Sequence, residues 1–231
     1  YAEDCKSLYG GSIPSEASTD FQARTSGGLT HVGERALMSG TSGQAATRTM
    51  ADLRLAMIDS QLRTCDVTDH SVLAAMDSVP REEFVPADRQ ALAYLDLPAP
   101  VGPDAAGRRL LAPMVMGRMA QALAVKPGES VLDYACASGY STAVFAAMGG
   151  KVTAVETDAA LAETARKTLA RLGVEATVTS ALPSGATFDA IFVNGACEVR
   201  PEALIDLLAL NGRLVCVLGG GRSGKAMVYR R

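Results

Sequence analysis

Residues 131–156 read VLDYACASGYSTAVFAAMGGKVTAVE, two short apolar segments separated by a run of small residues and an alanine-rich segment. The small residues at 135–139 follow the first apolar segment, the alanine-rich segment begins at Tyr140, and Gly149 and Gly150 end it. This order predicts a strand, a tight turn, a helix and a second strand, which is the βαβ unit of a parallel sheet. Small residues in such a turn let a ligand approach the backbone N–H groups at the start of the helix.

An acid closes this unit. Glu156 ends the second predicted strand, where a carboxylate accepts hydrogen bonds from ribose hydroxyls, so the unit indicates a nucleoside-containing ligand. The turn lacks the G-x-G-x-x-G spacing of dinucleotide-binding proteins. Its spacing is D-x-A-x-A-x-G, at Asp133, Ala135, Ala137 and Gly139, and an acid before the turn favours a cationic ligand over a pyrophosphate.

This spacing resembles motif I of the S-adenosylmethionine-dependent methyltransferases, usually written D/E-x-G-x-G-x-G. Two of the three glycines are alanine here, and Ala135 is the one expected to crowd the ligand slightly. The alternative interpretation is an ordinary βα turn in a parallel sheet. The resemblance implies S-adenosylmethionine as the cofactor, bound by Asp133, Ala135, Ala137, Gly139, Glu156 and Thr157.

The composition excludes several classes of protein. A length of 231 residues suits one good-sized domain with additions, and a net charge of -3 gives no support for nucleic-acid binding. The five cysteines form no C-x-x-C pair and there are two histidines, so we expect no metal site. No segment approaches the ~18 apolar residues of a membrane span, and no secretory signal is recognised. These features predict a cytoplasmic protein without a membrane partner.

The N-terminal segment differs from the rest of the chain. Residues 1–49 are rich in Gly, Ser, Thr and Ala and show no sustained helical or strand period, so we expect a mostly disordered extension, with Met50 as a natural start. Apolar residues then recur with helical spacing, which predicts a helical N-terminal cap region over 50–113. Asp66 or Thr68 is expected to cap its second helix, and another short helix is expected at 88–94. Residues 114–231 are predicted to form the cofactor-binding α/β core, truncated before its last strand.

Several motifs in the predicted cap carry a second resemblance. Residues 72–76 read VLAAM, residues 79–86 read VPREEFVP, and residues 93–96 read AYLD. In this order, and with motif I some fifty residues later, they resemble the protein-L-isoaspartate O-methyltransferase family. The resemblance covers residues 50–231 and implies a Rossmann-like class I methyltransferase fold. In that α/β fold helices flank a mainly parallel twisted sheet, and a small helical cap covers the cofactor cleft.

The resemblance also indicates where the reaction centre lies. Family members carry a Ser or Thr two residues before a proline, and alignment on Pro113 places Leu111 at this position. Arg108 and Arg109 offer another way to hold a carboxylate, through charge-assisted hydrogen bonds. A solvated surface turn is the alternative interpretation of this arginine pair, and both interpretations stay open.

Two further positions are implied as cofactor contacts. Family members usually have a Gly-Asp-Gly turn whose acid contacts the adenine amino group, but Ser180, Ala181 and Leu182 stand there. Backbone groups and apolar contacts around Ala181 and Leu182 are therefore expected to hold the adenine. Asn194, at the carboxyl end of the strand predicted at 188–193, is expected to face the cofactor.

The segments that follow are predicted from local pattern. A helix is expected from Pro201 to about residue 209, and a turn at Asn211 and Gly212 is expected to lead into a strand at 213–218.

A glycine-rich segment near the C-terminus has another interpretation. Residues 219–225 match the phosphate-loop pattern G-x-x-x-x-G-K, but Ala226 replaces the required Ser or Thr. Residues 227–230 alternate like a strand, whereas a phosphate loop must open a helix. We expect a flexible turn between two strands.

The function predicted from these motifs is S-adenosylmethionine-dependent methyl transfer to L-isoaspartyl residues of damaged proteins or peptides, a protein-repair activity, as the resemblance implies. One alternative is a family member that methylates a different carboxylate or a small acceptor. Another is a catalytically silent module that binds a cofactor or a partner. Similarity of fold cannot choose the acceptor, and the oligomeric state is not predicted.

Overall fold

The computed structural model describes residues 48–102, 107–219 and 224–231. The first helical elements are α1 (Met50–Met57), η1 (Ile58–Leu62), η2 (Arg63–Cys65), α2 (His70–Ser78), η3 (Arg81–Phe84) and η4 (Ala87–Leu92). The later helices are α3 (Pro113–Leu123), α4 (Tyr140–Ala147), α5 (Ala159–Arg171) and α6 (Glu202–Ile205). The strands are β1 (Ala99–Pro100), β2 (Arg109–Leu110), β3 (Ser130–Tyr134), β4 (Lys151–Val155), β5 (Thr177–Thr179), β6 (Phe188–Cys197), β7 (Leu208–Leu218) and β8 (Lys225–Arg230).

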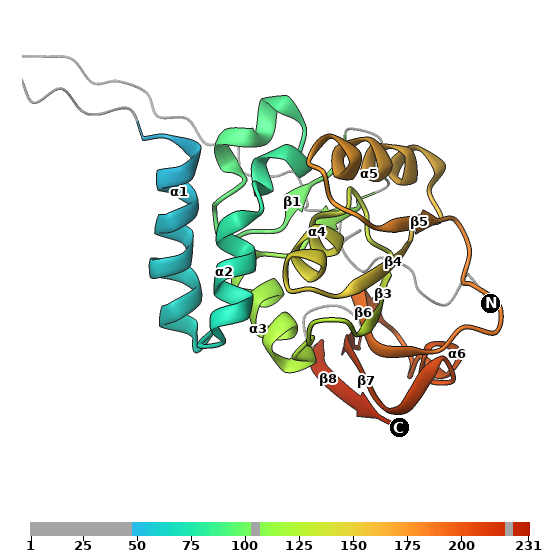
Figure 1. Cartoon of the computed structure of the whole chain (residues 1–231). Helices are drawn as coiled ribbons and strands as arrows, with labels where there is room; N and C mark the ends of the chain where they lie inside the picture. The colour runs from blue at the N-terminus through green and yellow to red at the C-terminus, as the bar shows by residue number, and fades with distance from the viewer. Residues whose placement is uncertain (1–47, 103–106, 220–223) are drawn as a thin grey trace, which may run out of the picture. The chain divides into compact units, whose positions relative to one another are not determined.

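A six-stranded sheet in the order β5-β4-β3-β6-β7-β8 organises these elements (Figure 1). The strands from β5 to β7 pair in parallel, and β8 pairs antiparallel with β7. Because parallel strands end on the same edge of a sheet, the turn after β3 and the acid after β4 lie next to each other. The predicted α/β fold with a mainly parallel sheet is confirmed.

Side chains that alternate along the central strands form two hydrophobic cores, one on each face of the sheet. In β3, Val131 belongs to one core and Leu132 to the other, and in β6 Phe192 and Ile191 divide in the same way. Residues of α1 to α5 complete the first core, whereas Leu204 of α6 packs into the second. Figure 1 accordingly shows α1 and α2 on one side of the sheet and α6 on the other.

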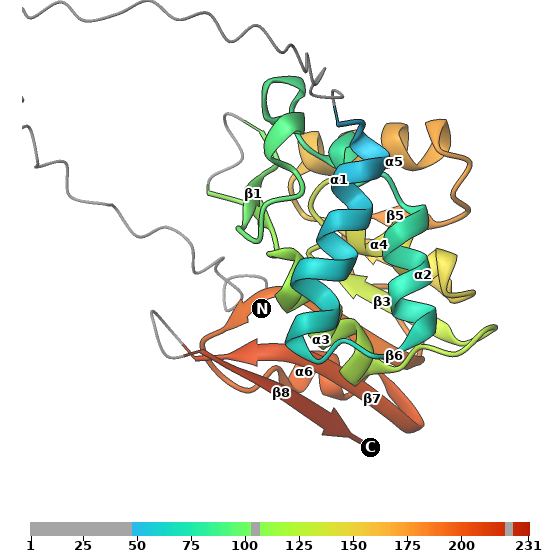
Figure 2. The same cartoon turned by 90° about the vertical axis from the view of Figure 1, so that its left-hand side faces the viewer.

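The helical cap region begins with two well-capped helices that lie side by side (Figure 2). Thr49 and Asp52 form a reciprocal capping box at the start of α1. Asp69 caps α2 through two backbone N–H groups of its first turn. The prediction of Asp66 or Thr68 as this cap is wrong, because Asp66 takes a left-handed conformation with φ of +62° where η2 ends.

Three other predicted segments need correction. The helix expected from Pro201 to about residue 209 ends at Ile205, because the chain is drawn into β7, where Leu208 pairs with Phe188. The helix expected at 88–94 is the 3-10 helix η4. The phosphate-loop interpretation of 219–225 is excluded, because the residues after Gly224 form strand β8 instead of a helix.

Some expectations concern residues that the structure does not describe. Residues 1–47, which make up nearly all of the expected disordered extension, and the expected turn at 220–223 lie outside the described ranges. The boundary between cap and core at residue 113 and the absence of a last strand stay predictions. Within the described ranges, no helix is long and apolar enough to cross a membrane.

Candidate active site

The turn after β3 has an unusual backbone. Ala135, Ala137 and Gly139 have φ values of +59°, +53° and +93°, so every second residue is in the left-handed region. This conformation costs an L-residue about 1–2 kcal/mol and costs glycine nothing, which explains the three glycines of the D/E-x-G-x-G-x-G pattern. At Gly139 packing adds a second requirement, because a Cβ atom there would lie 3.2 Å from Cδ1 of Leu169 in α5. The chain therefore adopts the expected turn with two strained alanines.

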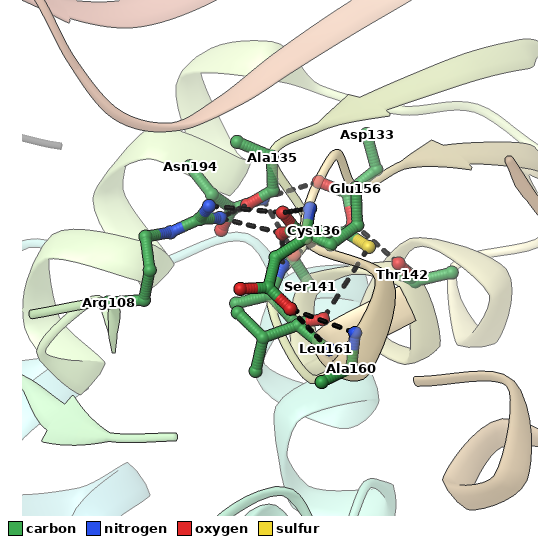
Figure 3. Close-up of polar contacts among 12 residues, drawn as sticks. Arg108, Asp133, Ala135, Cys136, Ser141, Thr142, Glu156, Ala160, Leu161 and Asn194 are labelled. Atoms are coloured by element: carbon green, nitrogen blue, oxygen red, sulfur yellow. Dashed lines mark hydrogen bonds and ion pairs between the residues drawn. The ribbon is translucent and has the colours of Figure 1, made fainter. Parts of the chain in front are cut away.

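Glu156 lies beside this turn, directly after β4, and its side chain is completely buried. Its Oε2 accepts hydrogen bonds from Nη2 of Arg108 and from the backbone N–H of Ala137, both at 2.7 Å. Its Oε1 accepts from Nη1 of Arg108 and from the backbone N–H of Asp158, both at 3.1 Å (Figure 3). A carboxylate offers about four acceptor positions, so this carboxylate is fully bonded within the chain.

The two predicted arginines have different environments. Arg108 is mostly buried, binds Glu156 through both terminal nitrogens, and donates a further hydrogen bond from Nη2 to the carbonyl of Ala135. Arg109 is exposed, and no hydrogen bond or ion pair of its side chain is found in the described part of the chain. The surface interpretation thus fits Arg109, whereas Arg108 holds a carboxylate of the chain itself.

Asp133, the acid of the motif, belongs to a buried network at the end of β3. Its Oδ2 accepts hydrogen bonds from the hydroxyls of Ser141 and Thr142 in α4, at 2.8 and 2.6 Å. Its Oδ1 accepts from the side-chain amide of Asn194 in β6 (Figure 3). Burial raises the pKa of Asp133 to about 6, although these hydrogen bonds act in the opposite direction. The structure brings Asp133 and Asn194 together, and their contact with a cofactor stays a prediction.

Leu111, at the position of the family hydroxyl, is held by a buried arginine that sequence reasoning missed. Its carbonyl accepts a 2.7 Å hydrogen bond from Nη2 of Arg81, and the carbonyl of Ala93 accepts from Nε of the same residue. The Arg81 guanidinium also lies 4.7 Å from the ring centroid of Tyr140, the first residue of α4. The only signal in the sequence was its place in the VPREEFVP motif, where three charged residues stand between apolar ones.

The predicted adenine contacts lie after the neighbouring strand. The N–H of Glu156 donates to the carbonyl of Thr179 at the end of β5, and the hydroxyl of Thr179 donates to the carbonyl of Ala181. Ala181 and Leu182 are exposed, as is Thr157. All three therefore border the carboxyl edge of the sheet, where a ligand is expected. Their role as cofactor contacts stays a prediction.

Two cavities differ in their relation to this site. The larger, of about 1080 Å³, opens at the amino ends of β4 and β5, near Lys151 and Thr177, which is the edge opposite the turn. The smaller, of about 490 Å³, is lined by Pro86, Asp88, Arg89, Pro100, Gly102, Gly107, Arg108 and Arg109. Arg108 connects it to the turn, because its Nη2 donates to the carbonyl of Ala135. Ligands of open parallel sheets bind at the carboxyl ends of the strands, so the smaller cavity is the relevant one.

Most of the chain matches a known protein family. The family model of protein-L-isoaspartate(D-aspartate) O-methyltransferase matches residues 54–231, which is most of the chain. The chain belongs to this family. Relatives named protein-L-isoaspartate O-methyltransferase include one from Methylorubrum populi, 42% identical over 177 residues that make up 74% of this chain and 82% of the relative. Another, from Gloeobacter violaceus, is 41% identical over 71% of this chain and 81% of its own length.

Solved structures of the isoaspartate methyltransferase family share the fold. A protein-L-isoaspartate O-methyltransferase superposes with a TM-score of 0.64 and 21% identity, covering 79% of this chain and 60% of the other. A beta-aspartate methyltransferase from Plasmodium falciparum, in complex with S-adenosyl-L-homocysteine, gives a TM-score of 0.65 and 20% identity. It covers 77% of this chain and 94% of its own. At these identities the solved structures support the fold alone.

The site offers no metal-binding group. Among the residues that the structure describes, no three His, Cys, Asp or Glu side chains gather as metal ligands. Cys136, inside the turn, is buried, and burial raises the pKa of its thiol. A thiol that stays protonated is a poor nucleophile and a poor metal ligand, so Cys136 acts here as a small packing residue.

Proposed function

We propose that this chain transfers a methyl group from S-adenosylmethionine to the side-chain carboxylate of L-isoaspartyl residues in proteins. The observation that carries the proposal is the buried carboxylate of Glu156 after β4, bonded to the N–H of Ala137 in the turn after β3. Membership of the isoaspartate methyltransferase family supports the same reaction.

The residues of the site fit a nucleoside. Arg108 donates two hydrogen bonds to the carboxylate of Glu156, one to each oxygen. The two hydroxyls of a ribose would donate hydrogen bonds to the same two oxygens. Exposed Ala181 and Leu182 would lie against the adenine, and the turn at 135–139 would approach the remainder of the ligand. S-adenosylmethionine supplies a methyl group on a positively charged sulfur. A carboxylate oxygen can attack the methyl carbon, and the sulfur then leaves as the neutral thioether of S-adenosylhomocysteine.

The contribution of the chain to this reaction is positioning. A carboxylate has a reference pKa near 4, so an isoaspartyl acceptor is ionised at neutral pH and needs no general base. Holding two reactants in line lowers the barrier by removing the entropy of their encounter. We propose that the backbone of Leu111, which is fixed by the buried Arg81, and the nearby Arg108 orient the acceptor carboxylate.

A second candidate is methylation of a different carboxylate or of a small acceptor. The observation that favours it is Leu111, whose apolar side chain stands where family members carry a hydroxyl. Such a hydroxyl orients the acceptor without being required by the chemistry, so its replacement alters the preference for an acceptor more than the ability to transfer a methyl group.

The test combines binding with acceptor choice. We expect S-adenosylhomocysteine to bind the full chain in a calorimetric titration, and Glu156→Ala to weaken binding at least tenfold, which corresponds to about 1.4 kcal/mol. Methyl transfer is then measured with an isoaspartyl peptide and with its aspartyl twin as control. Transfer to the isoaspartyl peptide alone supports the proposal, and transfer to neither peptide by a chain that binds the ligand favours the second candidate.

The biological setting follows from the same proposal. We propose that the methylation serves the repair of damaged proteins and that the chain acts in the cytoplasm. Proteins and peptides are the proposed partners, and nothing in the net charge of -3 favours a nucleic acid.

A further inference from the structure

Arg108 stands where a ribose is expected. Its Nη1 and Nη2 donate to the two oxygens of Glu156 at 3.1 and 2.7 Å, and its Nη2 also donates to the carbonyl of Ala135 at 2.9 Å (Figure 3). The Arg108 side chain is 16% exposed and that of Glu156 is completely buried. A two-pronged ion pair of this kind, shielded from water, is stronger than one on the surface.

The four bonds of Glu156 are not equally replaceable. Two come from the backbone N–H groups of Ala137 and Asp158, which lie in the turn after β3 and at the start of α5. These donors cannot leave without unfolding the turn or the helix cap. The guanidinium of Arg108 is carried by a long flexible side chain and supplies the other two bonds. A ligand that donates to Glu156 must therefore displace Arg108.

A neighbouring cavity can receive the displaced guanidinium of Arg108. Arg108 also lines the cavity of about 490 Å³, together with Arg89, Arg109 and Asp88. Asp88 lies 3.2 Å from Arg89 and offsets its charge, so Arg109 and a released Arg108 would leave this cavity positive. A carboxylate that enters the cavity meets two arginines, one of which becomes available only when Glu156 has taken another partner.

We propose that Arg108 is a latch, held on Glu156 in the absence of ligand, released by the cofactor ribose, and then paired with the carboxylate of the methyl acceptor. This inference rests on the proposed function and extends it to the order of binding. The cofactor binds first, and part of its binding free energy is used to break the pair between Arg108 and Glu156. The acceptor then binds more tightly, because Arg108 is free to pair with its carboxylate. By linkage, the cofactor and the acceptor strengthen each other's binding by the same factor.

The first experiment is a calorimetric titration of S-adenosylhomocysteine into the full chain and its variants. Arg108→Met keeps the apolar stem and removes both donors, and we expect it to bind S-adenosylhomocysteine at least about tenfold more tightly than the wild type. Arg118→Met, which removes an exposed arginine of α3 outside this cavity, is the matched control and should bind within about twofold of wild type. If Arg108→Met destabilises the fold, Arg108→Lys serves instead, with a gain of a few-fold.

The outcomes separate the latch from the proposed function. Equal or weaker binding by Arg108→Met and Arg108→Lys, with a wild type that binds, overturns the latch and leaves the methyltransferase intact. Binding by Arg108→Met but not by wild type supports a latch that is hard to open. If folded wild type and variants all fail to bind, the proposed function and the latch fall together.

The second experiment measures the order of binding. An isoaspartyl peptide is titrated into wild type and Arg108→Met, with and without saturating S-adenosylhomocysteine. We expect the ligand to raise the affinity of wild type for the peptide at least about fivefold and to leave the weak affinity of Arg108→Met unchanged. Equal peptide affinity with and without ligand in wild type, or the same increase in Arg108→Met, would overturn the release of Arg108 to the acceptor.

Discussion

At the scale of single residues, the most consequential group is Asp133, a carboxyl that is completely buried among hydroxyls and an amide. Burial raises the pKa of Asp133 in the folded chain to about 6, from an ordinary value of 3.8. The folded state thus holds its proton more tightly than the unfolded state. This contribution to stability is complete below pH 3.8 and is lost as the pH rises through about 6.

We predict that Asp133→Asn removes this pH dependence. The raised pKa of Asp133 corresponds to a loss of up to about 3 kcal/mol in the free energy of unfolding of the wild type as the pH rises, because one pKa unit is about 1.4 kcal/mol. Most of this loss falls between about pH 4.5 and 7.5. Urea unfolding of both proteins at the two pH values measures it. The wild type should lose stability relative to the variant as the pH rises, and equal losses in the two proteins would contradict the raised pKa.

A second prediction concerns the strained turn. Ala135→Gly removes a methyl group from a residue with φ of +59° that is only partly buried. Relief of backbone strain stabilises the folded chain by about 1–2 kcal/mol, and the greater freedom of glycine in the unfolded chain costs about 0.5–1 kcal/mol. We therefore predict a gain of about 0.5–1 kcal/mol in the free energy of unfolding. The matched control is Ala170→Gly, exposed in α5, which should lose about 1 kcal/mol. Destabilisation by both changes would argue against the left-handed turn.

At the scale of elements, Arg213 of β7 joins the sheet to the end of α3. Its guanidinium donates to the carbonyls of Leu123, Ala124 and Asp189 and to both oxygens of Glu129. The side chain is 9% exposed. This single residue satisfies the carbonyls that the end of α3 would otherwise leave unpaired in the interior.

Arg213→Met should therefore be strongly destabilising. Loss of one partner from a buried ion pair costs about 3–5 kcal/mol, because the remaining groups are left without their hydrogen bonds. The control is Arg166→Met on exposed α5, where the ion pair with Glu163 lies on the surface and should contribute at most about 1 kcal/mol. Thermal unfolding of the three proteins compares them, and a small effect at Arg213 would show that the end of α3 finds other donors.

At the scale of the whole molecule, one sheet separates two cores, so both should be lost in the same transition. Ile191 and Phe192 are neighbours in β6, are both completely buried, and point into opposite cores. We expect Ile191→Ala to cost about 2–5 kcal/mol and Phe192→Ala about 3–5 kcal/mol. Circular dichroism and tyrosine fluorescence should follow one urea transition in each variant, with exposed Val228→Ala as the control. Two separated transitions would show that the faces unfold independently.

The sequence by itself determined the parts of this protein that depend on local pattern. The βαβ unit, the alternation of the strands, the tight turn after Asp133 and the acid at Glu156 could all be inferred, because periodicity and turn chemistry act over a few residues. The left-handed backbone of that turn came from the structure. The family motifs added the family itself, which the family model bears out, and the methyltransferase fold, which the solved structures share. The ends of elements could not be inferred in the same way, because they depend on pairing with distant segments. The strand predicted at 213–218 begins at Leu208, where β7 pairs with Phe188 of β6.

Only the tertiary structure decided which charged residues work together. In the sequence Arg108 and Arg109 are equivalent, yet the first reaches Glu156, 48 residues away, and the second remains in solvent. Arg81 and Arg213 are buried against backbone carbonyls, although charged residues usually lie at the surface. The physical reason is that burial and the choice of partner arise from where distant segments cross, whereas composition and spacing describe each segment alone.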